Sequence, residues 1–198
     1  MFHSNPSAGI VFSPVIFFDS EKSWLQPCPV RCSWTNLMRG NFIHTCSCVM
    51  VKRKLIVDEN EYFDPACVPS DDYDLWLRIG RKNEIVRTPD FLVRYRIHAN
   101  NVSSNLCRIH KTLLTIYPKV YPCIKNDPEY SFWKKLFLLG RLRRSHAWAC
   151  RTCSIEGANE RETRNLAWQA FCLYPAQPAN LFNLLCVLLF SSNRKNLS

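Results

Sequence analysis

Hydrophobic and polar positions divide the chain near residue 105 into a strand-like part and a helical part. In the first part, apolar and β-branched runs are bounded by turn residues, which is typical of strands. The runs are Gly9–Ser13, Val15–Asp19, Phe42–Val51, Glu84–Arg87 and Phe91–His98. The last run alternates most clearly, so Arg94, Arg96 and His98 are expected on one face of a strand. Residues 20–40 show little periodicity and are expected to form a loop.

Helical spacing of apolar residues begins within the first part and dominates the second. We expect a short helix or turn over Leu55–Tyr62, and a helix over Asp71–Arg81 with Ser70 as its N-cap and Asn83 at its end. The helices predicted after Ser103 are Leu106–Tyr117 (ending before Pro118), Phe132–Cys153, Asn159–Tyr174 and Leu181–Phe190. The pattern therefore predicts an α/β domain over residues 1–105 and a helical extension over 106–198.

Three carboxylates, Asp71, Asp72 and Asp74, precede the apolar residues of the Asp71–Arg81 helix. Two interpretations remain open. Acidic residues in a first helical turn complement the helix dipole, and most such clusters do nothing else. Alternatively, one of the carboxylates stands at a cleft and accepts a proton from a substrate.

Four groups of residues occur in order around this cluster, and together they resemble a known family. They are the apolar strand from Asn41 that ends in Lys52-Arg53, the pair Phe63-Asp64, the run Asp71-Asp72-Tyr73-Asp74-Leu75-Trp76-Leu77-Arg78, and Tyr95-Arg96-Ile97-His98. This set resembles the second half of a family 2 glycosyltransferase domain of the GT-A type. The resemblance covers about residues 5–105.

The resemblance implies a partial GT-A domain, Rossmann-like with a mixed sheet, that transfers a sugar from a nucleotide-sugar donor to an acceptor hydroxyl. Family members place a metal-binding Asp-x-Asp before this region, whereas the single Asp-x-Asp of this chain is Asp72-Tyr73-Asp74. We therefore expect that the N-terminal nucleotide-binding half is lacking, and whether the chain transfers sugar without that half stays open. The expected partners are the nucleotide sugar, a carbohydrate or lipid-linked acceptor, and either the missing half or a second copy.

The resemblance also implies roles for particular residues. Asp72 matches the family's catalytic base, and Asp71 stands where the family has a Glu on the acceptor side. Trp76 is a candidate for substrate binding that we expect to pack beneath the site. Arg94 and Arg96 are candidates for binding the diphosphate. His98 is the candidate ligand of the divalent metal, Mg or Mn, that the complete family domain uses.

The net charge of +10 is concentrated in one segment. Residues 108–151 contain 10 Lys/Arg and 2 Asp/Glu, a net charge of +8, whereas the flanking segments are each close to neutral. Such a segment suits a membrane surface, and Trp133, Phe137 and Trp148 among its basic residues could form an interfacial helix. A solvated helical face is the alternative, with Lys and Arg stems lying on apolar neighbours.

Eleven cysteines and the absence of a secretory signal at Met1 suggest reduced thiols in the cytoplasm, with possible peripheral attachment to a membrane. The pairs Cys28/Cys32, Cys46/Cys48 and Cys150/Cys153 could be imagined as zinc ligands, but only the last has finger-like spacing. No apolar run reaches the roughly 20 residues that a spanning helix requires.

Two functional alternatives to sugar transfer remain at this point. The chain could be a non-catalytic remnant that acts as an interaction protein. It could also be a basic module that binds membranes or RNA through residues 108–151, although nucleic acid is the less expected partner.

Overall fold

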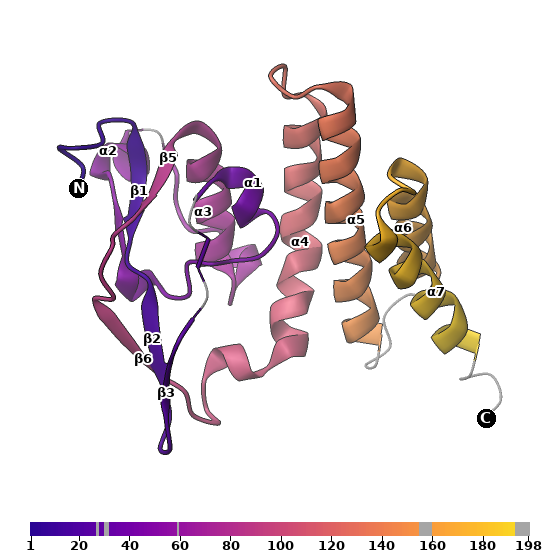
Figure 1. The fold of residues 1–198 in the computed structure, drawn as a ribbon, viewed down its shortest axis with the longest axis horizontal. Helices are drawn as coiled ribbons and strands as arrows, with labels where there is room; N and C mark the ends of the chain where they lie inside the picture. The colour runs from indigo at the N-terminus through magenta and orange to yellow at the C-terminus, as the bar shows by residue number, and fades with distance from the viewer. Residues whose placement is uncertain (27, 30–31, 59, 155–159, 193–198) are drawn as a thin grey trace. The chain divides into compact units, whose positions relative to one another are not determined.

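The computed structural model describes residues 1–26, 28–29, 32–58, 60–154 and 160–192. The chain forms two compact units, Met1–Asn105 and Leu106–Ser198. The first unit combines strands with helices, and the second consists of helices (Figure 1). The predicted α/β class is therefore confirmed.

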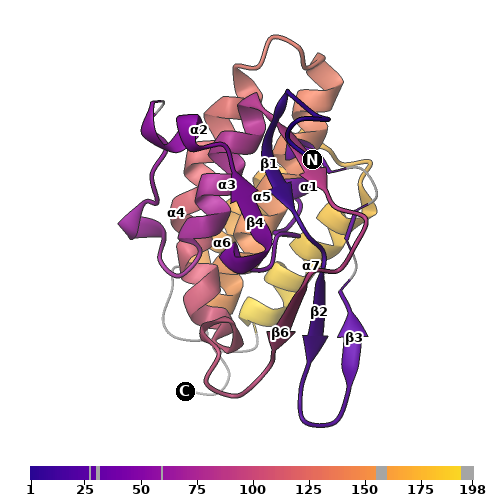
Figure 2. The same cartoon turned by 90° about the vertical axis from the view of Figure 1, so that its left-hand side faces the viewer.

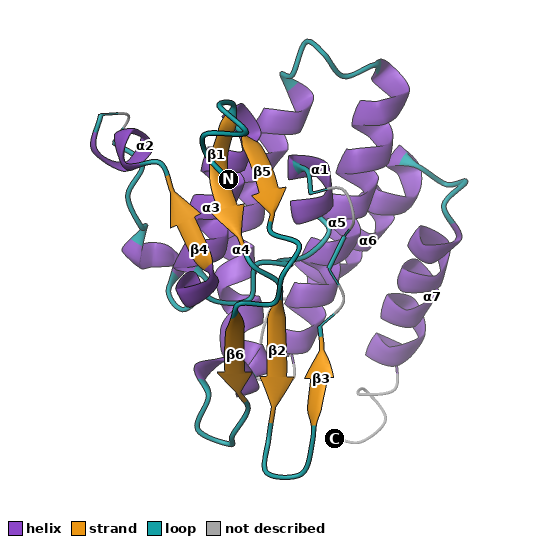
Figure 3. Cartoon of the chain, turned by 60° about the vertical axis from the view of Figure 1, so that its left-hand side comes forward, coloured by secondary structure: helices purple, strands orange, loops and turns teal. Residues whose placement is uncertain are grey.

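A mixed three-stranded sheet forms the centre of the first unit (Figure 3). β1 (Ala8–Phe12) is its middle strand, antiparallel to β4 (Val49–Val51) and parallel to β5 (Glu84–Arg87). All five residues of β1 are buried, which explains why its sequence is apolar throughout rather than alternating.

A second three-stranded sheet continues from the first after Pro14, which separates β1 from β2 (Figure 2). β2 (Val15–Phe18) lies between β3 (Ser23–Leu25), to which it is antiparallel, and β6 (Val93–Arg96), to which it is parallel. Except for Val15, the β2 side chains are only half-buried, so this sheet contributes less to the core than the first.

The core of the first unit lies between the first sheet and its helices. α3 (Asp71–Lys82) packs against β1 and β5, and α1 (Trp34–Leu37) packs against α3. α2 (Arg53–Val57) contributes Leu55 to the core, and the other elements are the 3₁₀ turns η1 (Cys46–Cys48), η2 (Pro65–Cys67) and η3 (Val102–Ser104). The largest fully buried apolar side chains of this unit are Ile10, Phe12, Val15, Leu37, Ile43, Leu55, Leu75 and Ile79.

Two sequence-based predictions for the first unit are wrong in detail. Residues 20–40 are not all loop, because they contain β3 and α1; the side chain of Ser33 caps α1 by accepting the N–H of Asn36. The predicted strand Phe42–Val51 shrinks to Val49–Val51, because Thr45 caps a 3₁₀ turn by accepting the N–H of Ser47. At Ser33 the side-chain hydrogen bond begins a short helix, and at Thr45 it favours a turn over an extended strand.

The described residues of the second unit form four helices in chain order, which follow one another along the ribbon in Figure 1. They are α4 (Leu106–Lys125), α5 (Phe132–Ser154), α6 (Glu160–Leu173) and α7 (Pro178–Ser192). α5 packs against each of the other three, and α6 packs against α7. The core cluster consists of Ala147, Cys150, Leu166, Ala167, Leu184 and Val187.

Asn180 joins three of these helices through its buried side chain. Its amide nitrogen donates to the carbonyl oxygens of Ala170 (2.9 Å) and Tyr174 (3.0 Å), and its oxygen accepts from Arg144 Nη1 (2.8 Å). Because the amide group is so fully hydrogen-bonded, its burial costs little and the ends of α6 and α7 are fixed to α5.

The predicted end of the first helix of this unit is also wrong. α4 continues through Pro118 and Pro122, both of which are exposed. The buried side chains of Ile116, Val120 and Ile124 offset the hydrogen bonds that the two prolines remove. Pro178 is the first residue of α7, a position where proline is favoured.

Among the described helices, none combines the length and the hydrophobicity that crossing a bilayer requires. The ten cysteines that the structure describes form no disulfide with one another. The side chain of Cys153, from the pair with finger-like spacing, lies outside the described residues.

Candidate active site

The candidate site is built on the first turn of α3. Asp71, Asp72 and Asp74 all lie in this turn, where their charges complement the helix dipole. Ser70 occupies the predicted N-cap position, but its side chain makes no capping hydrogen bond. The reason is its backbone ψ of 27°, since a capping side chain normally requires an extended backbone.

Hydrogen bonds from neighbouring elements hold this turn in place. The hydroxyl of Tyr73 donates to the carbonyl oxygen of Leu37 (2.9 Å), at the end of α1. The indole N–H of Trp34 donates to the carbonyl oxygen of Leu77 (2.8 Å), one turn further along α3. All of these groups are buried, so the bonds fix the position of α3 against α1.

Asp74 holds the loop that precedes α3. Its buried carboxylate pairs with Arg78 Nε at 2.9 Å, and Arg78 in turn donates to the carboxylate of Glu61 and the carbonyl oxygen of Tyr62. Asp74 therefore has a structural role, which leaves Asp71 and Asp72 as the carboxylates available for chemistry.

Asp72 is half-buried and its pKa is raised above the usual value. The largest cause is desolvation by burial, and the charge of Asp71 adds to it, while the N–H of Tyr73 bonds to Oδ1 at 2.6 Å and acts in the opposite direction. A carboxylate with a raised pKa holds a proton more tightly, so Asp72 is a better proton acceptor than an exposed aspartate.

Cys46 is a neighbour of Asp72 that the sequence analysis did not foresee. Its thiol lies 3.9 Å from Asp72 Oδ2, from the turn η1. Burial, together with the charges of Asp72 and Asp71, raises the pKa of Cys46 to about 11. The thiol therefore stays protonated at neutral pH and can donate a weak hydrogen bond to the carboxylate.

Trp76 lies in the core, where its ring meets Phe63 edge-on at a centroid distance of 6.5 Å. Its indole nitrogen is buried without a hydrogen-bond partner among the described residues. The side chain thus packs beneath the first turn of α3, as expected.

Arg94 and Arg96 lie together on β6, as the alternation predicted. Both guanidinium groups lie over the ring of Phe18, at 4.6 and 5.6 Å from its centroid, and both side chains are exposed. They belong to the second sheet, however, whereas α3 packs against the first. No hydrogen bond or ion pair described in the structure joins them to Asp71 or Asp72.

His98 is exposed beyond the end of β6, and its backbone N–H donates to Asn101 Oδ1 at 2.7 Å. Two groups of three potential metal-ligating side chains occur within the described residues: His146, Cys150 and Glu162, and Asp64, Cys67 and Asp74. Neither group includes His98, Asp71 or Asp72. The donor set around His98 therefore does not fit a complete Mg or Mn site, and the cofactor remains a prediction.

The hollows lined by described residues include two of about 350 Å³ each. One is beside the C-terminal end of α3, lined in part by Ser33, Arg81 and Glu84, and the other is in the helical unit. Asp72 lines neither of these two hollows.

Comparison with known proteins found no match: no family model, curated protein or solved structure matches the chain.

Proposed function

We propose that the unit Met1–Asn105 is the acceptor-side part of a family 2-like glycosyltransferase, with Asp72 as its general base. The main support is the Asp72 carboxylate itself, which is half-buried and has a raised pKa. It lies on a helical turn that the hydrogen bond from Tyr73 to Leu37 holds in place. The ordered resemblance of residues 5–105 to that family supplies the reaction type.

In the proposed reaction, Asp72 accepts the proton of an acceptor hydroxyl while the hydroxyl oxygen forms a bond to the anomeric carbon of the donor sugar. The bond from that carbon to the nucleoside diphosphate breaks, and the electron pair leaves with the diphosphate. Asp71 is proposed to bind the acceptor, Trp76 to support the turn from below, and Arg94 and Arg96 to offset the diphosphate charge.

The test is a transfer assay with nucleoside diphosphate sugars, using the protein alone and mixed with a separately expressed nucleotide-binding half of a family 2 enzyme. Asp72→Asn should lower the rate of transfer by at least about 100-fold, because loss of a general base typically costs that much. Asp58→Asn, which removes an exposed aspartate outside the site, is the matched control. Unchanged transfer by Asp72→Asn would refute the assignment, and absence of transfer in every mixture would favour a non-catalytic interaction protein.

A second candidate function is binding to an anionic membrane surface. Phe132 and Trp133 begin α5 with 67% and 70% of their surfaces exposed, and Lys134 follows them with its ammonium over Tyr130. Exposed aromatic rings beside lysines suit the boundary between lipid headgroups and acyl chains. Phe137, also considered for this role, packs against Tyr174 instead.

Vesicle sedimentation tests this candidate. The protein should bind vesicles that contain phosphatidylserine, and a double variant Phe132→Ala/Trp133→Ala should bind at least about tenfold more weakly. Trp168→Ala, which removes another exposed tryptophan, should bind like the wild type. Equal binding by all three proteins would exclude the two aromatic residues as the anchor.

A further inference from the structure

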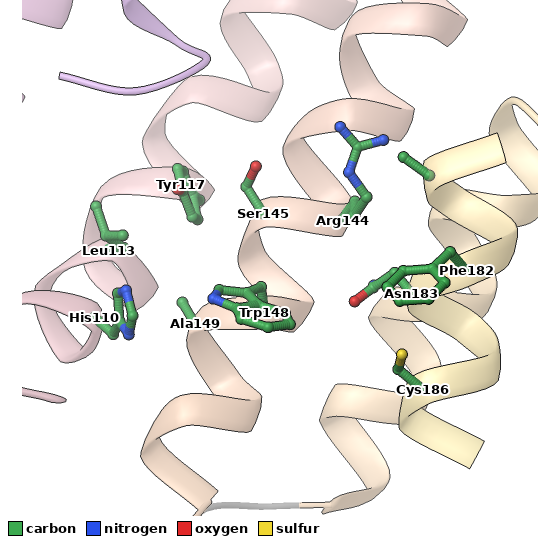
Figure 4. Close-up of a pocket in the computed structure, with 11 residues that line it drawn as sticks. His110, Leu113, Tyr117, Arg144, Ser145, Trp148, Ala149, Phe182, Asn183 and Cys186 are labelled. Carbon is green, nitrogen blue, oxygen red and sulfur yellow. The ribbon is translucent and has the colours of Figure 1, made fainter. Parts of the chain in front are cut away.

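A groove of about 350 Å³ lies within the helical unit, between α4, α5 and α7 (Figure 4). Its volume is within the range of roughly 300–1,000 Å³ that small-molecule sites occupy. α4 contributes His110, Leu113 and Tyr117, α5 contributes Arg144 and Trp148, and α7 contributes Phe182 and Asn183 among other residues. Sequence periodicity could not reveal this groove, because its walls come from helices far apart in the chain.

Most of the groove surface is apolar. Trp148 and Phe182 are 51% and 68% exposed, although such rings are usually buried in a folded protein. Arg151 covers one part of the Trp148 ring, with its guanidinium 5.4 Å from the centroid. A ligand with a hydrocarbon chain would remove apolar surface of both rings from water, which is favourable.

Hydrogen-bond donors lie among these apolar walls. Asn183 is only 5% exposed, and its amide nitrogen has no hydrogen-bond partner among the described residues. Figure 4 shows its side chain directed from α7 towards α5. A buried donor without a partner destabilises the fold, and a ligand that offers an acceptor oxygen would correct this.

Arg144 supplies a positive charge to the same groove. Its Nη1 donates to Asn180 Oδ1, and it has no carboxylate partner among the described residues. Partial burial lowers the pKa of Arg144, which means that its charge lacks full hydration. A guanidinium has five N–H groups, so donors remain for an anionic ligand.

We propose that this groove binds a single-chain amphiphile with an anionic head group, either a carboxylate or a phosphate. The head group lies between Arg144 and Asn183, and the chain lies along Leu113, Trp148 and Phe182. The net charge of +8 in residues 108–151 favours an anion over a cation or a neutral molecule. The apolar walls favour an amphiphile over a polyanion such as RNA, which would need more cations and stacking surfaces.

Calorimetric titration with monomeric ligands tests the proposal on the full chain. Dodecyl phosphate and dodecanoate should bind, whereas inorganic phosphate should bind at least about 100-fold more weakly because it lacks the chain. The neutral dodecyl maltoside, used below its micelle concentration, should bind at least about tenfold more weakly because it lacks the charge. Equal affinity for the neutral detergent would refute the role of the head group, and equal affinity for inorganic phosphate would refute the role of the chain.

Two variants separate this groove from other surfaces. Phe182→Ala removes a largely exposed ring and should weaken binding of dodecyl phosphate about tenfold without unfolding α7. Arg144→Gln should weaken binding of dodecyl phosphate but leave binding of dodecyl maltoside unchanged. Trp168→Ala, which changes an exposed ring outside the groove, is the matched control. A Phe182→Ala variant that binds like this control would overturn the proposal, even if Arg144→Gln failed to fold.

Discussion

At Asp72, burial and a neighbouring negative charge both disfavour the ionised carboxylate. The residue therefore opposes folding at neutral pH, unlike Asp74, whose carboxylate is paired with Arg78. Ionised groups that destabilise the folded state are common at functional sites. Partial desolvation raises the pKa of a carboxylate, which makes it a better proton acceptor and also makes its charge less favourable in the folded protein. Asp72 and Asp74 thus differ in physical role although they lie in one helical turn.

The first prediction concerns the pH dependence of this cost. The folded state holds the Asp72 proton to a higher pH than the unfolded state, so stability falls as pH rises from the unfolded pKa of about 3.9 to the raised folded pKa. Asp72→Asn should therefore have a higher Tm than the wild type at pH 7. At pH 3, where both states are protonated, the difference should vanish. Thermal melts of both proteins and of Asp58→Asn would check this, and a lower Tm for Asp72→Asn at pH 7 would contradict it.

Cys28 is a second residue whose surroundings change its chemistry. The neighbouring Cys32 side chain, with help from Arg87, lowers the pKa of Cys28 to about 7. The thiols of both cysteines lie within 3.8 Å of the carbonyl oxygen of Pro29, to which each donates. The pKa of Cys32 is raised by its interaction with Cys28 and by burial. The sequence analysis found no finger-like spacing in this pair, and the interaction of the two thiols in the structure makes Cys28 the more reactive of them.

The second prediction follows from this difference between thiolates. Iodoacetamide should alkylate Cys28 with a rate that rises through a midpoint near pH 7, because the thiolate is the nucleophile. Cys46, which is exposed but has a pKa of about 11, should react much more slowly at that pH. Cys32→Ala should slow alkylation of Cys28 roughly tenfold at pH 7, because it removes the side chain that lowers the pKa of Cys28. Mass spectrometry of the labelled peptides measures each rate, and faster labelling of Cys46 than of Cys28 would show the contact to be wrong.

At the scale of elements, hydrophobic pattern predicts most strands and helices but not where local hydrogen bonds or packing interrupt it. β1, β2, β5 and α3 lie close to their predicted positions because burial and periodicity agree there. The pattern could not show that Thr45 would cap a turn inside the predicted strand Phe42–Val51. It also could not show that buried side chains would keep α4 helical beyond Pro118.

The third prediction uses the two prolines of α4. Proline inside a helix lowers the stability of the helix by about 3 kcal/mol relative to alanine. Replacing it with alanine also increases the conformational entropy of the unfolded chain, which offsets about 0.4–1 kcal/mol of the gain in stability. Because Pro118 is exposed, Pro118→Ala can restore a backbone hydrogen bond without a clash and should stabilise the protein by about 2 kcal/mol. Pro128→Ala, in the turn after α4, should not stabilise it. Urea denaturation of the three proteins is the measurement, and a loss of stability in Pro118→Ala would mean that packing requires the distorted helix.

At the scale of the whole molecule, the sequence predicted which secondary-structure elements carry the candidate site residues, but not how those elements pack together. It placed Asp71 and Asp72 on the first turn of a helix and Arg94 with Arg96 on one strand face. It could not predict that α3 packs on one sheet while β6 belongs to the other, because strand order depends on contacts between distant segments. The groove of the helical unit escaped prediction for the same reason.

The fourth prediction concerns net charge, which is also a property of the whole chain. Within residues 108–151, ten Lys and Arg residues outnumber two Asp and Glu residues, so the net charge of this segment is +8. Repulsion among those residues should destabilise the folded state, and salt should screen it within a Debye length of about 10 Å at 0.1 M. The free energy of unfolding should therefore rise between 20 and 300 mM NaCl, roughly the range over which such screening develops.

Neutralising part of the basic segment should have the same effect as salt. Lys134→Gln/Lys135→Gln should be more stable than the wild type at low salt and should respond less to NaCl, because two of the repelling charges are gone. Arg53→Gln/Lys54→Gln removes two charges from the segment 1–107, where basic and acidic residues nearly balance, and serves as the control. If both double variants responded to salt like the wild type, the ammonium groups of Lys134 and Lys135 would already be compensated. The basic segment would then behave as an ordinary solvated face, and its charge would no longer support binding of an anionic ligand or surface.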